Sequence, residues 1–185
     1  MKMKKLIILC AALLALQACR PGGISYKGFS FSYPDTYSLE TTKADNDARY
    51  YFLKDTEDGI NFVYIEQIPD YLKLCGDTTP GNLDICQHMV LLIHDLADSY
   101  FFSQNEDVAI DKDFGFTVKT PESEAEIPTA NAELRGTYDG LPFRAYFAAD
   151  LWGDNMVTTL MCAFSDDVLK TQIQEIFQTY EWRAE

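Results

Sequence analysis

Three cysteines have the residue type and the positions for redox or structural chemistry: Cys75, Cys86 and Cys162. Cys75 and Cys86 bracket a segment rich in proline and glycine, which predicts a disulfide between them in an oxidising compartment. Closing a loop of that size stabilises a fold by roughly 3 kcal/mol. The alternative is that Cys86 is a reactive thiolate near a helix N-terminus, although no C-x-x-C motif supports redox work. Cys162 lies in an apolar stretch and is expected to be a buried thiol.

The two histidines, His88 and His94, are the other candidates for metal binding or proton transfer. Their spacing places the two side chains about 120° apart on a helix, too far apart to bind one metal ion together. Asp84 precedes His88 by one turn and Asp98 follows His94 by one turn, so each pair shares a helix face. We expect histidines at the surface or edge of a helix and no bound metal. A metal-dependent enzyme would need a histidine to meet carboxylates in a cleft.

Acidic residues cluster at 45–47 and 105–113 and could attract Ca²⁺. Both segments lack the alternating oxygen ligands, central glycine and closing glutamate of an EF-hand, which favours solvated loops. No serine lies in a G-x-S-x-G motif, and no glycine-rich loop has the pattern that holds a phosphate. The sequence therefore predicts no cofactor and a non-catalytic protein. A hydrolase with paired carboxylates stays open as an alternative.

The composition argues against nucleic-acid partners and gives the chain many aromatic residues. Asp and Glu number 29 against 15 Lys and Arg, for a net charge of −14. Phosphate backbones repel such a chain, so nucleic-acid binding is not expected. The 11 Tyr and 12 Phe either fill the faces of a sheet, the commoner arrangement, or line a ligand groove.

Aromatic and β-branched residues alternate with polar ones in several short runs, which predicts β-strands. "GFSFSYP" is the clearest, with its aromatic residues on one face and Pro34 at its end. The expected strands cover residues 29–33, 49–54, 60–68, 108–110, 114–118, 132–138, 141–149 and 156–164. Residues 55–59 and the pair Asp139-Gly140 are typical of hairpin turns.

Two segments have the spacing of helices. Residues 83–102 carry an apolar stripe of Ile85, Met89, Ile93, Leu96 and Tyr100. Val90, Leu91 and Leu92 widen this stripe and predict contact on more than one side. A last helix after Ser165 has the stripe Leu169, Ile173, Ile176, Phe177 and Tyr180. Strands, a long helix, more strands and a final helix indicate an α+β fold, with a mostly antiparallel β-sheet covered by helices.

The start of the chain resembles the signal peptide of bacterial lipoproteins. The basic "MKMKK" precedes an apolar run at 6–18, which spans about 20 Å as a helix. Because the hydrocarbon core of a membrane is about 30 Å thick, this run fits a signal peptide and not a membrane span. "LQAC" at 16–19 resembles a lipobox. The resemblance implies that residues 1–18 are removed and that Cys19 carries acyl chains such as palmitate, which anchor the protein to the membrane.

A second resemblance covers residues 26–182. "YKGFSFSYPDTYSL" is similar to the opening of PsbP-like proteins and of DcrB-type bacterial lipoproteins, and "IFQTYEW" is similar to their closing segment. The resemblance implies a PsbP-like αβα sandwich. It also implies a family whose members bind partners or support assemblies and share no active site.

Together these patterns predict three parts: a signal peptide at 1–18, the lipidated Cys19 with an irregular tether at 19–25, and a single domain at 26–185. Arg20 in place of an aspartate favours the outer membrane, with the domain facing the periplasm. We expect a non-catalytic binding or envelope-support module with a protein partner in the cell envelope. The alternatives are a small-ligand carrier with an aromatic-lined groove between sheet and helix, and a hydrolase or metal-dependent enzyme.

Overall fold

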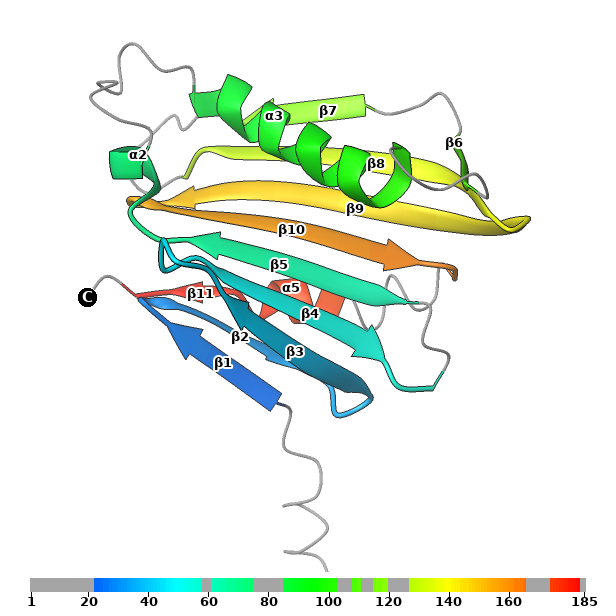
Figure 1. Cartoon of the computed structure of the whole chain (residues 1–185), viewed down its shortest axis with the longest axis horizontal. Helices are drawn as coiled ribbons and strands as arrows, with labels where there is room; N and C mark the ends of the chain where they lie inside the picture. The colour runs from blue at the N-terminus through cyan, green and yellow to red at the C-terminus, as the bar shows by residue number, and fades with distance from the viewer. Residues whose placement is uncertain are drawn as a thin grey trace, which may run out of the picture.

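The computed structural model describes residues 22–57, 61–74, 85–102, 108–110, 115–119, 127–165 and 174–183. Its centre is an eight-stranded antiparallel sheet with the order β3-β4-β5-β10-β9-β8-β6, in which β7 also pairs with β8 (Figure 1). The strands are β3 (Tyr37–Lys43), β4 (Arg49–Asp55), β5 (Phe62–Ile68), β6 (Val108–Ile110), β7 (Gly115–Lys119), β8 (Thr129–Tyr138), β9 (Leu141–Trp152) and β10 (Asn155–Ala163). The predicted fold class is confirmed.

The remaining elements cover the two faces of this sheet. On one face lie α3 (Ile85–Ala97) and the π-helical turn η1 (Asp98–Phe102), over β8, β9 and β10. On the other face lie a small sheet with the order β1-β2-β11 and the short helix α5 (Gln174–Gln178). The small sheet consists of β1 (Gly22–Tyr26), β2 (Phe29–Tyr33) and β11 (Glu181–Trp182), and a further short helix, α2 (Tyr71–Leu74), follows β5. None of the described helices is long and apolar enough to cross a membrane.

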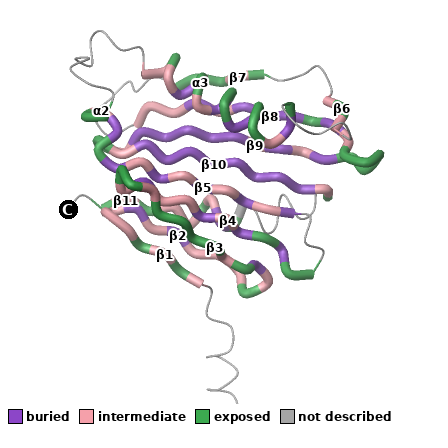
Figure 2. Tube along the Cα trace, in the orientation of Figure 1, coloured by how far each residue is buried: buried purple, intermediate pink, exposed green. Residues whose placement is uncertain are grey.

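Each face of the large sheet has its own hydrophobic core, because side chains alternate between the faces of a strand. The α3 core contains Met89, Ile93 and Phe101 packed on Phe147 and Leu160. The core on the opposite face joins Phe29 and Phe31 of β2 to side chains of β4, β5 and β10. Figure 2 shows that β9 and β10 are buried along most of their length, whereas β3 at the sheet edge is largely exposed.

The hairpin expected at Asp139-Gly140 is confirmed, and local geometry explains why. Both residues have positive φ, 48° and 77°, as a type I′ turn requires. Glycine adopts such angles at no steric cost, and aspartate tolerates them better than most residues. The turn sets the register in which Tyr138 lies opposite Leu141.

For residues 22–25, the described part of the expected tether at 19–25, the structure corrects the prediction of irregular chain. Gly22 and Gly23 lie in β1 and pair with Tyr33 and Ser32 of β2. A Cβ atom on Gly22 would lie 2.1 Å from Cζ of the Tyr33 ring. The missing side chain therefore makes room for an aromatic ring and does not serve to loosen the chain.

The long helix is confirmed in part. Met89, Ile93 and Leu96 are buried as its stripe predicts. The prediction that the helix makes contact on a second side is wrong for Leu91, whose side chain is 57% exposed. After Ala97 the helix widens into η1, a change of pitch that the apolar spacing does not reveal. The strands β3 and β11 were also not expected, because β3 is a polar edge strand and β11 is only two residues long.

Candidate functional site

The elements that cover the two faces of the large sheet are offset from each other. Part of the sheet face on which α3 packs therefore extends beyond α3. Over β4 and β5 this face carries Tyr50, Phe52, Phe62 and Tyr64, which are all partly exposed. Cross-strand pairing places Phe52 beside Tyr64 and Tyr50 beside Glu66. The result is an aromatic surface that η1 borders through Tyr100, whose ring lies 5.7 Å from that of Phe62 and 5.5 Å from that of Tyr64.

The π-helical turn η1 packs two consecutive aromatic rings against the sheet. Tyr100 stacks on Phe62, while Phe101 stacks on Phe143 with ring centroids 5.1 Å apart. Single π-helical turns are rare and occur often at functional sites. Here the turn forms the wall of a groove against the sheet.

This aromatic groove has a volume of about 320 Å³. It lies between η1 and the ends of β4, β5, β8, β9 and β10, and its lining residues are Phe52, Lys54, Phe62, Tyr100, Phe101, Val108, Tyr138, Phe143, Cys162 and Phe164. Ligand sites are typically concave and apolar, with a few polar groups that orient the ligand. The groove has this character.

Three polar groups lie among the rings of the groove. Lys54 is exposed at its rim, and Tyr138 is 40% exposed. Burial, and to a lesser degree the nearby Glu66, raises the pKa of the Tyr100 hydroxyl. Tyr100 therefore stays neutral at physiological pH and can donate or accept a hydrogen bond.

Cys162 is buried in the floor of the groove with a free thiol, as its apolar surroundings predict. Burial raises the pKa of this thiol to about 12. Because the thiolate is the nucleophilic form of cysteine, Cys162 behaves here as a small apolar lining group.

Glu66 is the ionisable residue of the neighbouring aromatic surface. Thr158 on β10 lies opposite it, and the Thr158 hydroxyl donates a hydrogen bond of 3.4 Å to Oε2. Burial raises the pKa of Glu66, and the bonds from Thr158 and Tyr50 partly oppose that rise. Glu66 does not line the groove.

Neither of the two histidines that the sequence singled out lines this groove. His88 is half-buried, and its Nδ1 lies 3.4 Å from the Tyr71 hydroxyl. His94 is exposed, with its ring 4.8 Å from that of Phe116. Both therefore lie at the surface or edge of α3, as expected. Within the described ranges, no three His, Cys, Asp or Glu side chains gather in a way that could hold a metal ion.

Several sequence predictions fall outside the described residues, among them the signal peptide at 1–18, most of the acidic cluster at 105–113 and the first part of the last helix. Cys86 is half-buried at the start of α3, but Cys75 is not described, so the disulfide between them stays a prediction. Cys19, the expected lipidation site, also lies outside them.

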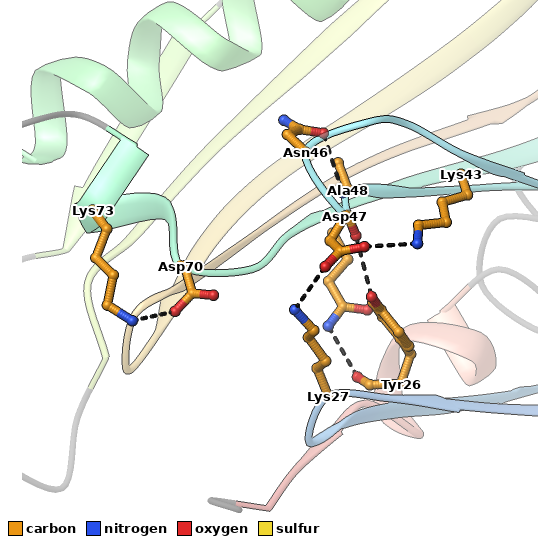
Figure 3. Close-up of polar contacts among 9 residues, drawn as sticks. Tyr26, Lys27, Lys43, Asn46, Asp47, Ala48, Asp70 and Lys73 are labelled. Atoms are coloured by element: carbon orange, nitrogen blue, oxygen red, sulfur yellow. Dashed lines mark hydrogen bonds and ion pairs between the residues drawn. The ribbon is translucent and has the colours of Figure 1, made fainter.

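The acidic segment at 45–47 is part of a polar contact between the two sheets (Figure 3). Asp47 Oδ1 and Oδ2 bind the ammonium groups of Lys43 and Lys27, at 2.7 and 3.5 Å. These lysines, the hydrogen bond from Lys43 above all, lower the pKa of Asp47. The carboxylate is already matched by cations of the chain, which favours a structural role for this loop over Ca²⁺ binding.

A second cleft lies on the opposite face of the large sheet, beside α5. It measures about 400 Å³ and is lined in part by Glu133, Arg144, Tyr146 and Phe177. Arg144 and Arg135 both bind Oε1 of Glu133, at 2.6 and 2.9 Å, and Arg144 lowers the pKa of this carboxyl most. Because these charges satisfy one another, we consider the smaller aromatic groove the better candidate.

The sequence did not identify Lys54, Phe52 or Phe62 as site residues. One signal was present: aromatic residues occupy alternate positions in two strands that were expected to be neighbours. The register that places Lys54 opposite Phe62 and the approach of η1 to them depend on tertiary structure.

Comparison with known proteins identifies the fold. No family model and no curated protein matches the chain. A protein of Bacteroides thetaiotaomicron VPI-5482 is similar with a TM-score of 0.49 and 10% identity over 89% of this chain, which spans about half (49%) of that protein's length. The solution structure of cyanobacterial PsbP (CyanoP) from Synechocystis sp. PCC 6803 has a TM-score of 0.55 and 12% identity, over 88% of this chain and 92% of that one. The chain therefore has a PsbP-like fold, as its sequence resemblance implies.

Proposed function

We propose that this chain is a lipid-anchored binding protein of the cell envelope that holds a small apolar molecule in the aromatic groove. The observation that carries the proposal is the groove itself, about 320 Å³ of space walled largely by Phe and Tyr rings. A cavity of about 150 Å³ accepts one benzene molecule, so this volume suits a ligand of about two rings. Of the functions that the sequence leaves open, the groove favours the small-ligand carrier.

The chemistry of the lining supports binding and not bond cleavage. Seven of the lining side chains are aromatic, and the Cys162 thiol is kept protonated by burial. Aromatic walls favour offset or edge-to-face contacts with a flat ligand. Such a site gains affinity from apolar burial.

The proposed location comes from the sequence. The lipobox resemblance at 16–19 supports acylation of Cys19 and attachment to the membrane. Arg20 after the cysteine favours the outer membrane, with the folded domain in the periplasm. A protein partner in the envelope is compatible with a PsbP-like domain and remains a second proposal, which co-purification from membranes would test.

The first prediction concerns ligand capture. Full-length protein in detergent, titrated calorimetrically with 2-naphthol, should bind this neutral two-ring probe more strongly than detergent alone does. Phe52→Ala removes one aromatic wall and should weaken binding at least fivefold, because the probe loses its stacking partner.

Tyr50→Ala is the matched control, since Tyr50 lies on the same strand and face but does not line the groove. It should change the affinity by less than twofold, with thermal melting verifying that both variants fold. No binding by the wild-type protein, or equal losses in the two variants, would refute the groove as a ligand site.

A further inference from the structure

Lys54 gives the aromatic groove a positive charge at its rim. In β4 it lies opposite Phe62 and two residues from Phe52, so all three side chains share one face of the sheet. Lys54 lines the groove and is exposed. Its ammonium group can therefore reach a molecule seated among the rings while its aliphatic stem lies along them.

Other lysines of the described chain differ from Lys54 in their surroundings. Lys27 and Lys43 bind Asp47, and Lys73 binds Asp70. Within the residues that the structure describes, no carboxylate forms an ion pair with Lys54. In a chain with 29 acidic and 15 basic residues, a cation beside an apolar groove leaves a positive charge for a ligand to match.

We propose that the aromatic groove binds planar aromatic anions of about two rings, with the ring system among Phe52, Phe62 and Tyr100 and the carboxylate at Lys54. This inference rests on the proposed ligand-binding function and adds the charge of the ligand to it. A charge-assisted hydrogen bond is stronger than a neutral one. The same contact excludes aromatic cations, which would meet like charge at the rim.

The shape of the groove supports a flat ligand. The rings of Phe62 and Tyr100 are stacked at 5.7 Å, with planes 29° apart, and those of Phe52 and Phe62 lie 5.5 Å apart. Neighbouring rings of similar tilt present a broad apolar wall. The volume of about 320 Å³ limits the ligand to about twice the size of benzene.

Besides Glu66, whose charge acts on Tyr100, one exposed acidic residue weakens the attraction for anions. Glu40 of β3 lies opposite Phe52 in the register and is therefore on the same face as Lys54. Its exposed carboxylate is one strand further from the groove and does not line it. Removing this charge should strengthen anion binding, whereas removing Lys54 should weaken it.

Three probes that differ in charge but not in ring system test the inference: 2-naphthoate, 2-naphthol and 2-naphthylmethylammonium. We expect full-length protein in detergent to bind 2-naphthoate about tenfold more tightly than 2-naphthol, and the ammonium probe most weakly. Lys54→Gln should remove the advantage of 2-naphthoate and leave the affinity for 2-naphthol within twofold. Glu40→Gln should strengthen 2-naphthoate binding, and Lys73→Gln, a lysine remote from the groove lining, should change nothing.

The outcomes separate this inference from the proposed function. Equal binding of 2-naphthoate and 2-naphthol would overturn the anion preference and leave the groove as a neutral apolar site. Equal losses of both probes in Lys54→Gln would also overturn it, because the lysine would then act on the groove's structure. Failure of all three probes to bind would refute the ligand-binding function itself.

Discussion

Asp150 is a buried carboxyl group near the end of β9 in the large sheet, 6% exposed. It lies on β9 between Thr129 of β8 and Val157 of β10. Burial raises its pKa from 3.8 to about 6, although a hydrogen bond from Thr129 opposes the rise. The folded protein thus holds the proton of Asp150 more tightly than the unfolded chain does, and ionisation of this group costs stability.

This property predicts a pH dependence of stability. Because the folded pKa is raised, the contribution of Asp150 is fully favourable below about pH 4 and is lost as the pH rises through about 6. The loss amounts to about 3 kcal/mol at most. Asp150→Asn keeps a hydrogen-bonding side chain without the charge, and should raise the free energy of unfolding at pH 7 and flatten its fall between pH 4 and pH 7.

Urea unfolding at several pH values measures the effect of Asp150→Asn. Glu40→Gln, which removes an exposed carboxyl from β3, is the control and should leave the pH profile close to that of the wild-type protein. If the pH profile of the Asp150→Asn variant were as steep as the wild-type one, Asp150 would not be responsible for the fall.

At the scale of elements, a tight turn joins β1 to β2 in the small sheet. The same turn contacts the chain at the end of the C-terminal strand β11. Lys27 and Gly28 between β1 and β2 both have positive φ, 43° and 81°. A Cβ atom on Gly28 would lie 2.3 Å from the carbonyl oxygen of Arg183. Arg183 in turn donates its backbone N–H to the Gly28 carbonyl at 2.8 Å. Gly28 therefore allows β11 to pair with β2.

Gly28→Ala should break this arrangement, whereas Gly140→Ala is a matched control. Gly140 has a similar φ of 77° but no atom within 4 Å of its Cβ position. Both variants bear the strain of a positive φ, about 1 kcal/mol. Gly28→Ala also forces the Arg183 backbone away, which should cost about 1–3 kcal/mol more. Thermal and urea unfolding of the pair measure the difference, and equal losses would exclude the close contact as its cause.

At the scale of the whole molecule, the elements that pack on the two faces of the large sheet lie over largely different strands. The small sheet and α5 pack on one face over β4, β5 and β10, while α3 packs on the other face over β8, β9 and β10 (Figure 1). The aromatic groove lies beside the second cover, where η1 extends α3 toward β5. The rigid sheet holds the rings in place, which limits the entropy that ligand binding would cost.

The proposed membrane attachment also concerns the whole molecule. Cys19→Ser removes the thiol that the lipobox resemblance identifies as the acylation site, so the variant should not enter the detergent phase in a Triton X-114 partition. Cys10→Ser, in the apolar run before the lipobox, is the control and should still partition as a processed lipoprotein. Detergent-phase recovery of processed Cys19→Ser protein would contradict the proposed anchor.

The sequence by itself determined the features that depend on neighbours in the chain. Alternating residues such as Phe29 and Phe31 predict strands, Asp139-Gly140 predicts a hairpin, and the spacing of Met89 and Ile93 predicts a helix. These are local patterns, and each follows from the geometry of one element. Together they were sufficient for the fold class.

Only the tertiary structure decided where these elements meet. Gly22 looks like a flexible residue until the Tyr33 ring is seen to lie against it, and Lys54 looks like an ordinary surface charge until Phe62 and Tyr100 are placed beside it. The groove takes its lining from strands, from η1 and from residues more than 100 positions apart, such as Phe52 and Phe164. Cross-strand register and the offset of the covers bring them together, and both depend on long-range packing that no local pattern encodes.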